Sequence, residues 1–255
     1  MINGLNIAAS GLLTSMYRQD VAANNLANLE TVGFKPDFAS TMSRAGVAEE
    51  DGLLSLPRNR LLDRLGAGVL LAPNRVKLAQ GSLEETGNQL NVALEGDGFL
   101  VARAGEGPDG LRLTRDGRLA VDTSGRLVLA TSGLPVLDTA GKPVQVGHAG
   151  FKVESDGAIT RDGLALARLR LARVSHPRHL SKLGQGLYAA PDGALAPASP
   201  ATRVVQGAVE RSGVDPIAAM MDVTSAASSV TSHSRLVQLY DELMGRTIST
   251  LGRVG

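Results

Sequence analysis

The side chains that most often perform chemistry in proteins are few in this sequence and poorly grouped. Histidines occupy four positions, His148, His176, His179 and His233, and only the second and third are close together. Pro177 lies between these two, so they cannot share one face of a helix as a metal-binding pair would. We interpret the pair as part of a solvated loop and predict no metal site.

Motifs of known catalytic chemistry are absent from the sequence. It contains no Gly-x-Ser-x-Gly, Ser-x-x-Lys, Walker or His-Glu-x-x-His pattern. Residues 96–98 lack the third glycine of a phosphate loop, and Asp116, Asp122 and Asp162 lack the ligand run of a calcium loop, so turns are predicted instead. The absence of cysteine excludes disulfides, thiolate zinc sites and cysteine nucleophiles. We predict that the chain is not an enzyme and has no catalytic residues and no cofactor.

The composition is that of a globular, aliphatic chain with almost no net charge. Hydrophobic residues make up 43% of the 255 residues, aromatic residues only 3%, and tryptophan is absent. The formal charge is +1, so no overall field attracts polyanions. Because single-stranded nucleic acids also need aromatic platforms, no nucleic-acid partner is predicted. One segment is basic, and we expect it to pair with acidic groups of a neighbouring subunit through Arg161, Arg168, Arg170, Arg173, Arg178 and Lys182.

The N-terminal segment carries the heptad pattern of a helix–helix contact. One series recurs every seven residues, and a second follows it three positions later. The first is Ile2, Ala9, Met16 and Ala23, and the second is Leu5, Leu12, Gln19 and Leu26. The segment lacks the basic start and continuous apolar centre of a secretory signal, so no cleaved signal peptide is predicted. No run of 18 apolar residues occurs, so no membrane span is predicted either.

The C-terminal segment repeats the same spacing over a longer stretch. Its series consists of Val223, Val230, Val237, Met244 and Leu251, and Asp215-Pro216 supplies an N-cap and a first-turn proline. Either helix alone could fold onto its own domain. Their placement at opposite termini and their many Ala and Ser residues favour two helices that pair with each other and with neighbouring subunits. The weakly charged Ser/Thr surface between 224 and 234 suits a wet contact or a polar channel wall.

The middle of the chain has the pattern of a hairpin-rich β domain. Short apolar runs are separated by Asp-Gly and Ser-Gly pairs, at 116–117 and 124–125, which favour tight turns. Residues 165–174 alternate arginine with apolar residues, as one half-buried strand would. The predicted fold class is α+β, with long terminal helices that pair as a coiled-coil-like assembly domain and a central all-β domain. The predicted segments are an N-terminal helix and motif (1–35), a connector (36–74), a β body (75–208) and a C-terminal helix (209–255).

Four segments resemble the signatures of the bacterial flagellar basal-body rod family. The sequence ANNLANLETVGFK resembles the family's asparagine-rich helix end and its Thr-x-Gly-Phe-Lys motif, through Asn24, Asn25, Leu26, Asn28, Thr31, Gly33, Phe34 and Lys35. Residues 80–101 resemble the family's entry into its β domain. Residues 113–128 resemble its Tyr-Thr-Arg-Asp-Gly hairpin, with Leu113 in place of the tyrosine. Residues 209–222 resemble the entry into its C-terminal helix, with Gly213 in place of asparagine.

This resemblance implies a structural subunit of the rod of the flagellar basal body, the part that spans the periplasm. It implies that the terminal helices pair and line the inner tube of a helical polymer, which transmits torque and forms an export channel. The implied partners are further copies, other rod and hook-type axial proteins, and the flagellar type III export apparatus. It further implies that Gly33 supplies a special backbone conformation and that Phe34 anchors the turn into the β body.

Two questions stay open at the level of sequence. The segments LSLP and AAMMD are more similar to proximal rod proteins, whereas the length of residues 38–83 also suits distal ones, and we favour the proximal type. The Arg-x-Tyr-Glu pattern typical of the C-terminal helix is missing, because Ser228 and Val230 occupy its places. The alternative function is a β-rich carbohydrate- or peptidoglycan-binding module with oligomerising tails. That function would need an exposed aromatic platform, and Phe99, Phe151 and Tyr188 are too few and too scattered to form one.

Overall fold

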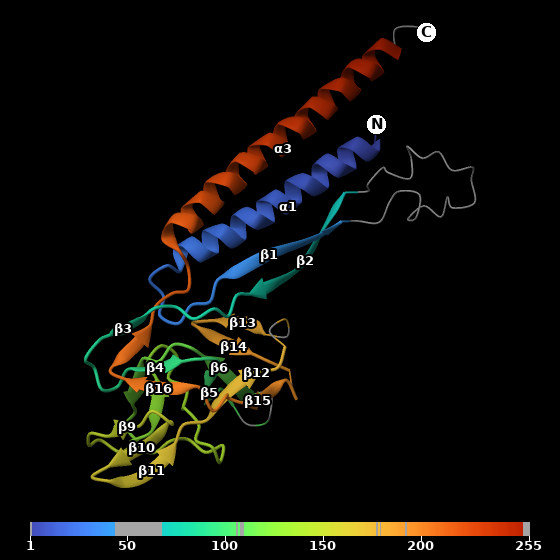
Figure 1. Ribbon diagram of the computed structural model, residues 1–255. Helices are drawn as coiled ribbons and strands as arrows, with labels where there is room; N and C mark the ends of the chain where they lie inside the picture. Colours follow the sequence, from blue (N-terminus) through green and yellow to red (C-terminus); the bar gives the residue numbers. More distant parts are fainter. Residues whose placement is uncertain are drawn as a thin grey trace. The chain divides into compact units, whose positions relative to one another are not determined.

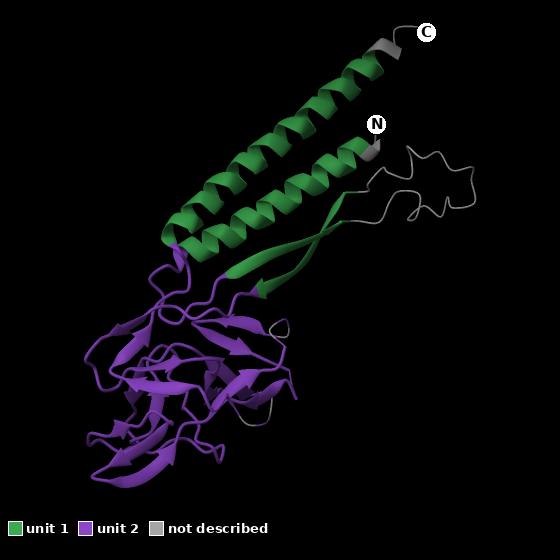
Figure 2. Ribbon diagram, in the orientation of Figure 1, with its two compact units in different colours: residues 1–26, 37–75, 216–255 green, residues 27–36, 76–215 purple. Residues whose placement is uncertain are grey.

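The computed structural model describes residues 2–43, 68–105, 107, 110–176, 178, 180–191 and 193–251. The chain forms two compact units (Figure 2). The helical unit comprises residues 1–26, 37–75 and 216–255, and the β unit comprises residues 27–36 and 76–215. These units differ from the predicted segments, because residues 27–36 belong to the β body rather than to the N-terminal helix.

The helical unit contains α1 (Ile2–Ala27) and α3 (Pro216–Leu251), which run antiparallel (Figure 1). At 1.5 Å per residue they are about 39 and 54 Å long. The antiparallel direction follows from two contacts, since Gly4 of α1 faces Tyr240 and Gly11 faces His233. α3 starts at Pro216, the predicted first-turn proline.

A two-stranded sheet completes the helical unit, and the sequence analysis missed it. β1 (Asp37–Ser43) pairs with β2 (Val69–Val76) within the stretch predicted as a connector. Alternation is weak in both strands because most of their side chains are half-buried or exposed. The acidic patch at 49–51 and the LSLPRNR segment lie outside the described residues.

The β unit is built from short strands in several small sheets, as the turn-rich sequence predicts. The largest sheet has the order β13-β14-β6-β5-β12-β15, a second has the order β11-β10-β9, and three two-stranded sheets pair β16 with β4, β17 with β3 and β7 with β8. The strands are β3 (Leu83–Glu85), β4 (Val92–Glu95), β5 (Phe99–Arg103), β6 (Leu111–Thr114), β7 (Leu119–Val121), β8 (Leu127–Leu129), β9 (Lys152–Val153), β10 (Ala158–Arg161), β11 (Leu164–Arg168), β12 (Leu171–Val174), β13 (Ser181–Gly184), β14 (Leu187–Ala189), β15 (Leu195–Pro197), β16 (Arg203–Gln206) and β17 (Ala208–Glu210).

Strand β5 lies at the centre of the β unit. Leu100 and Ala102 pack in one hydrophobic cluster, whereas Phe99 and Val101 pack in a second cluster on the other face. A strand buried on both faces has no polar alternation, which explains its continuous apolar sequence. The two clusters give the β unit a core of its own.

The predicted single strand at 165–174 is wrong in one respect. The segment forms two strands, β11 and β12, which belong to different sheets. Leu169, between them, is 2% exposed and packs in the core, so the chain turns inward there. The alternation therefore breaks at Leu169, and the exposed Leu164 and Leu166 lie in β11.

Candidate functional site

The Gly33-Phe34-Lys35 segment is buried within the β unit rather than lying in a surface loop. The Gly33 N–H donates to the Glu210 carbonyl over 2.7 Å, and Gly33 has a φ of +67°. A Cβ at this position would clash with the backbone carbonyl of Arg115. Both findings require glycine, as the resemblance implied. Phe34 is 8% exposed and anchors the turn in the β unit.

Lys35 forms a buried ion cluster with two residues from distant parts of the chain. Its Nζ lies 2.6 Å from Oε1 of Glu210, and Nη1 of Arg115 lies 3.0 Å from Oε2 of the same carboxylate. The three side chains are 1%, 1% and 4% exposed for Lys35, Glu210 and Arg115. One carboxylate thus faces two cations in the interior of the protein.

Backbone groups add three hydrogen bonds to this cluster, whereas the buried Nε of Arg115 has no hydrogen-bond partner among the described residues. Lys35 Nζ donates to the Ala79 carbonyl over 2.8 Å, and Arg115 Nη2 donates to the Gly96 carbonyl over 2.7 Å. The Gly81 N–H donates to Glu210 Oε1 over 2.8 Å. Burial lowers the pKa of Lys35 below 10.5, and the adjacent carboxylate opposes that shift. Buried charges are tolerated when paired and hydrogen-bonded in this way.

A second lysine covers the same segment from strand β13. Lys182 Nζ donates to the Lys35 carbonyl over 2.6 Å and lies 4.2 Å from the centre of the Phe34 ring. The Lys35 N–H donates to the hydroxyl of Tyr188, which is 1% exposed. The motif is therefore held by side chains from both ends of the β unit's sequence.

The ion cluster brings together three segments that resemble family signatures. Lys35 ends the Thr-x-Gly-Phe-Lys motif, Arg115 belongs to the Thr-Arg-Asp-Gly hairpin, and Glu210 precedes the C-terminal helix. Sequence analysis identified each segment but missed that they meet. A signal was present in part, because Glu210 directly follows the apolar Ala208-Val209 pair and a charge in such a strand needs a buried partner.

Two of the predicted asparagines form hydrogen bonds with nearby residues. Asn25 pairs with Asp37 of β1 through both amide atoms, donating to its carbonyl over 2.8 Å and accepting from its N–H over 2.9 Å. Asn28 accepts a hydrogen bond from the Thr31 hydroxyl over 3.1 Å. α1 ends at Ala27, so the asparagines lie at the helix end as predicted. Asn24 is exposed and Leu26 is half-buried.

Small residues, rather than the predicted seam, form the buried face of α1. Ala8, Ser15 and Ala22 are 6%, 6% and 7% exposed, and they repeat at seven-residue intervals. Gly11 lies on the same face, where a Cβ would come within 2.7 Å of the His233 ring. Close approach of two helices selects small side chains at the contact.

The predicted seam residues differ in burial between the two helices. On α3, Val223, Val230, Val237 and Met244 are half-buried. On α1, Leu5, Ala9 and Leu12 are half-buried, but Ala23 is exposed and Met16 is 47% exposed. The side chains of Ile2 and Leu251 lie outside the described residues. The role of these residues in assembly stays a prediction.

The Ser/Thr surface of α3 satisfies its own hydrogen-bond donors. Hydroxyls donate to the carbonyl four residues earlier over 2.9–3.0 Å at Thr224, Ser228, Ser229, Thr231 and Ser232. Such back-bonding satisfies the donors of these five hydroxyls while the surface stays polar.

Several side chains of the basic segment have hydrogen-bond or ion-pair partners inside the β unit, which was not predicted. Arg161 donates to the carbonyls of Ala149 and Gly150, each over 3.2 Å, and Arg168 pairs with Asp156. Together with the Lys182 contacts, three of the six basic side chains have partners in their own chain. The predicted pairing of this segment with a neighbouring subunit stays a prediction.

Other predicted sites can be checked among the described residues. His176 is exposed and His179 lies outside them. Within the ranges that the structure describes, no group of three or more possible metal ligands occurs, and no helix is long and apolar enough to cross a membrane. Phe99, Phe151 and Tyr188 form no exposed platform, because they are 3%, 8% and 1% exposed and pack in the core.

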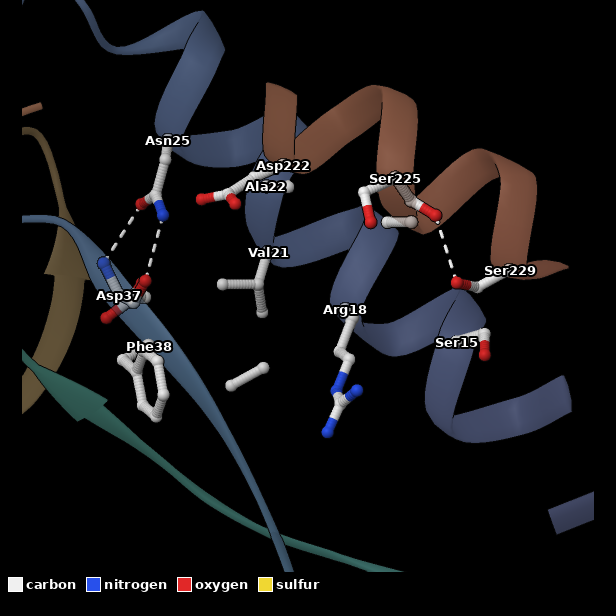
Figure 3. A pocket seen from close by; sticks show the side chains of 12 residues that line it. Ser15, Arg18, Val21, Ala22, Asn25, Asp37, Phe38, Asp222, Ser225 and Ser229 are labelled. Carbon is white, nitrogen blue, oxygen red and sulfur yellow. Dashed lines mark hydrogen bonds between the residues drawn. The ribbon is translucent and has the colours of Figure 1, made fainter. Parts of the chain in front are cut away.

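A pocket of about 280 Å³ lies in the helical unit, between α1, α3 and β1 (Figure 3). Val21, Ala22 and Ala226 provide apolar lining, and its charged residues are Arg18, Asp37 and Asp222. Arg18 also donates to the Thr41 hydroxyl of β1 over 3.1 Å. The pocket combines an apolar base with charged and hydroxyl groups at its rim.

The geometry defines an α+β protein whose two ends meet in one helical unit, and comparison with known proteins gives its family. Residues 5–35 match the family described as "Flagella basal body rod protein", and residues 205–250 match "Flagellar basal body rod FlgEFG protein C-terminal". Flagellar basal-body rod protein FlgG of Borreliella burgdorferi is 28% identical over 96% of this chain and 97% of its own length. FlgF of Salmonella typhimurium is 28% identical over the same shares, and FlgF of Caulobacter vibrioides is 28% identical over both full lengths. These matches at both ends of the chain, together with relatives aligned over 96% or more of its length, support the assignment of the chain to the bacterial flagellar basal-body rod protein family.

Proposed function

We propose that this chain is a structural subunit of the flagellar basal-body rod. It polymerises head to tail with copies of itself and with other axial proteins into a helical tube, because heterologous contacts that do not close generate filaments. The tube transmits torque and encloses an export channel, and the subunit reaches it through the flagellar type III export apparatus. The chain has no catalytic role.

The observation that carries this proposal is that each of the two matched family regions supplies one helix of the helical unit. The region at 5–35 supplies α1 and the region at 205–250 supplies most of α3, and these helices run side by side. A long helix pair with a polar but donor-satisfied surface gains most of its stability from partners. The buried ion cluster explains how the β unit is held to the chain segments that lead into the helices.

The proximal rod remains the favoured position, on the strength of the sequence similarity alone. FlgG and FlgF relatives cover the chain about equally, so the type of rod protein is a proposal. Copurification of the chain with individual rod proteins after co-expression tests it. Selective binding to proximal rod proteins supports the assignment, and selective binding to the distal one contradicts it.

Assembly through the helices can be tested with two neighbouring substitutions in the full chain. Val230 is half-buried on the predicted seam, whereas Thr231 is exposed. We expect sedimentation velocity to show large species for the unchanged chain and for Thr231→Asp, and their loss for Val230→Asp. Equal association of both variants would exclude a role for the seam. The proposed function would be refuted if the chain stays monomeric at all concentrations and if bacteria that lack it swim normally.

A further inference from the structure

All methionines of the chain lie in the helical unit, although the β unit is the larger of the two. They occupy positions 1, 16, 42, 220, 221 and 244, and the β unit contains none. The chain has no cysteine, so the thioethers of methionine are its only sulfur atoms. Sulfur is the side-chain atom that peroxides oxidise most readily, and methionine oxidation is a common lesion in proteins. A peroxide should therefore act on the helical unit and spare the β unit.

Four of these methionines are exposed. The exposed fractions are 47%, 55%, 57% and 67% for Met16, Met42, Met220 and Met221. Met244 on α3 is half-buried, and the side chain of Met1 lies outside the described residues. Because an oxidant in solution reaches exposed sulfur first, the four exposed methionines should react before Met244.

The exposed methionines of the helices belong to small apolar patches. Leu13 is 61% exposed and lies one turn before Met16 on α1. Ile217 is 73% exposed and lies three and four residues before the Met220-Met221 pair on α3. Oxidation at these positions changes the character of a patch and not only that of an isolated side chain.

The exposed methionine of β1 has an apolar neighbour too. Phe38 is 67% exposed and lies four residues before Met42, on the same face of the strand. Side chains of a strand alternate between its two faces, so residues four apart point the same way. Each element that carries an exposed methionine thus presents it beside another exposed apolar side chain.

We propose that Met16, Met42, Met220 and Met221 form a reversible oxidation site that removes exposed apolar surface from the helical unit. A sulfur lone pair attacks one oxygen of a peroxide, so that an S–O bond forms and the O–O bond breaks. The thioether is oxidised by two electrons to a sulfoxide, and hydrogen peroxide is reduced to water. Methionine sulfoxide reductases reverse the step, with a dithiol oxidised to a disulfide and the oxygen released as water.

Oxidation at these positions should change the surface of the subunit and not its fold. A sulfoxide is polar, whereas the thioether is apolar and adaptable. None of the four methionines belongs to the hydrophobic clusters of the β unit, and each is about half exposed or more. Both units should therefore stay folded. A consequence for assembly rests on the proposed function: if copies cover these patches when they associate, the oxidised subunit should not polymerise.

Hydrogen peroxide added to the full chain tests the site, with peptide mapping by mass spectrometry as the readout. We expect one added oxygen at each of the four exposed methionines before Met244 reacts. At that point the circular dichroism spectrum should be unchanged, and the dilute chain should bind less of the dye ANS, which reports exposed apolar surface. Oxidation of Met244 as fast as the other four, or unchanged dye binding after their oxidation, would overturn the proposal.

The matched control is a variant that peroxide cannot oxidise at these positions. It combines Met16→Leu, Met42→Leu, Met220→Leu and Met221→Leu, which keep apolar side chains of similar volume. In sedimentation velocity, the oxidised chain should lose its large species and treatment with the two reductases MsrA and MsrB should restore them. The leucine variant should keep its large species in peroxide, and their loss would contradict the inference.

The same experiment separates this inference from the proposed function. If the oxidised and the untreated chain form large species equally, the inference fails and the proposed function stands. If the untreated chain does not associate at any concentration, the proposed function fails, and the order of oxidation and the dye binding still decide the inference.

Discussion

Glu210 is the side chain whose replacement should reveal most about the β unit. Its carboxylate is the one anion between the buried cations of Lys35 and Arg115, at 2.6 and 3.0 Å. Glu210→Gln keeps the shape but leaves both cations without their counter-charge. Removing one partner of a buried ion pair costs about 3–5 kcal/mol. A domain is stable by only about 5–15 kcal/mol, so this loss is a large share.

The control is the same chemical change at the surface. Glu84, on strand β3, lies 3.5 Å from Arg211, and both side chains are more than half exposed. Glu84→Gln should therefore cost at most about 1 kcal/mol. With a urea dependence of about 2 kcal/mol per molar, a loss of 4 kcal/mol lowers the unfolding midpoint by about 2 M.

Urea unfolding of the full chain can be followed in the β unit alone. The chain has no tryptophan and three tyrosines, of which only Tyr188 lies in the β unit. In a background of Tyr17→Phe and Tyr240→Phe, tyrosine fluorescence reports unfolding of that unit. If Glu210→Gln and Glu84→Gln differ by less than about 1 kcal/mol, the ion cluster does not hold the β unit together.

The pH dependence of the same variant has a defined sign. Burial lowers the pKa of Lys35 below 10.5, so the unfolded chain binds more protons than the folded chain just below that pH. The free energy of unfolding therefore rises with pH in this window, and falls as pH drops through the native pKa. Glu210→Gln removes the carboxylate that opposes the shift, so its deficit should shrink towards pH 10 without vanishing, because Arg115 stays charged. A deficit that grows with pH would contradict this account.

Three further outcomes follow from matched positions. Gly33→Ala should destabilise the β unit in urea by clearly more than Gly87→Ala, because both have φ near +68° but only the first meets backbone; equal losses would mean that strain alone matters. Gly11→Ala should lower the helical melting temperature, since its Cβ meets a ring at 2.7 Å, whereas Gly245→Ala, in open space, should raise it; a rise in both would refute close helix contact. Backbone hydrogen bonds lower the pKa of Asp122 below 3.8, so its carboxyl carbon should titrate low by NMR and its contribution to stability should disappear as pH falls through that native pKa; an ordinary titration would show that the turn opens in solution.

The helices, the turn-rich middle and the absence of catalytic motifs could be predicted from the sequence. Each depends on residue types and on spacings within a short stretch of chain. The seven-residue spacing at Val223 and its successors reflects a period of the helix itself. The first-turn proline and the turn glycines act within a few residues. The family resemblance implied a special backbone conformation at Gly33, and its φ of +67° confirms this.

What failed in prediction depended on where separate elements meet. The sequence did not show that Arg161 and Arg168 bond to carbonyls and a carboxylate in their own unit. The strand at 165–174 divides because Leu169 is drawn into a core formed by other strands. β1 and β2 were not predicted, because their side chains do not alternate between the core and the solvent.

The sequence by itself determined the order of elements, the family resemblance and the amphipathic helices at both termini, since these follow from residue type and local spacing. Only the tertiary structure decided that the buried carboxylate of Glu210 contacts both Lys35 and Arg115, although up to 175 residues separate these side chains. It also decided that small residues, not the leucines, form the buried face of α1, and so left Leu13 and Met16 exposed. Ion pairing and burial act through space, and a linear pattern does not record which residues the folded chain brings within reach.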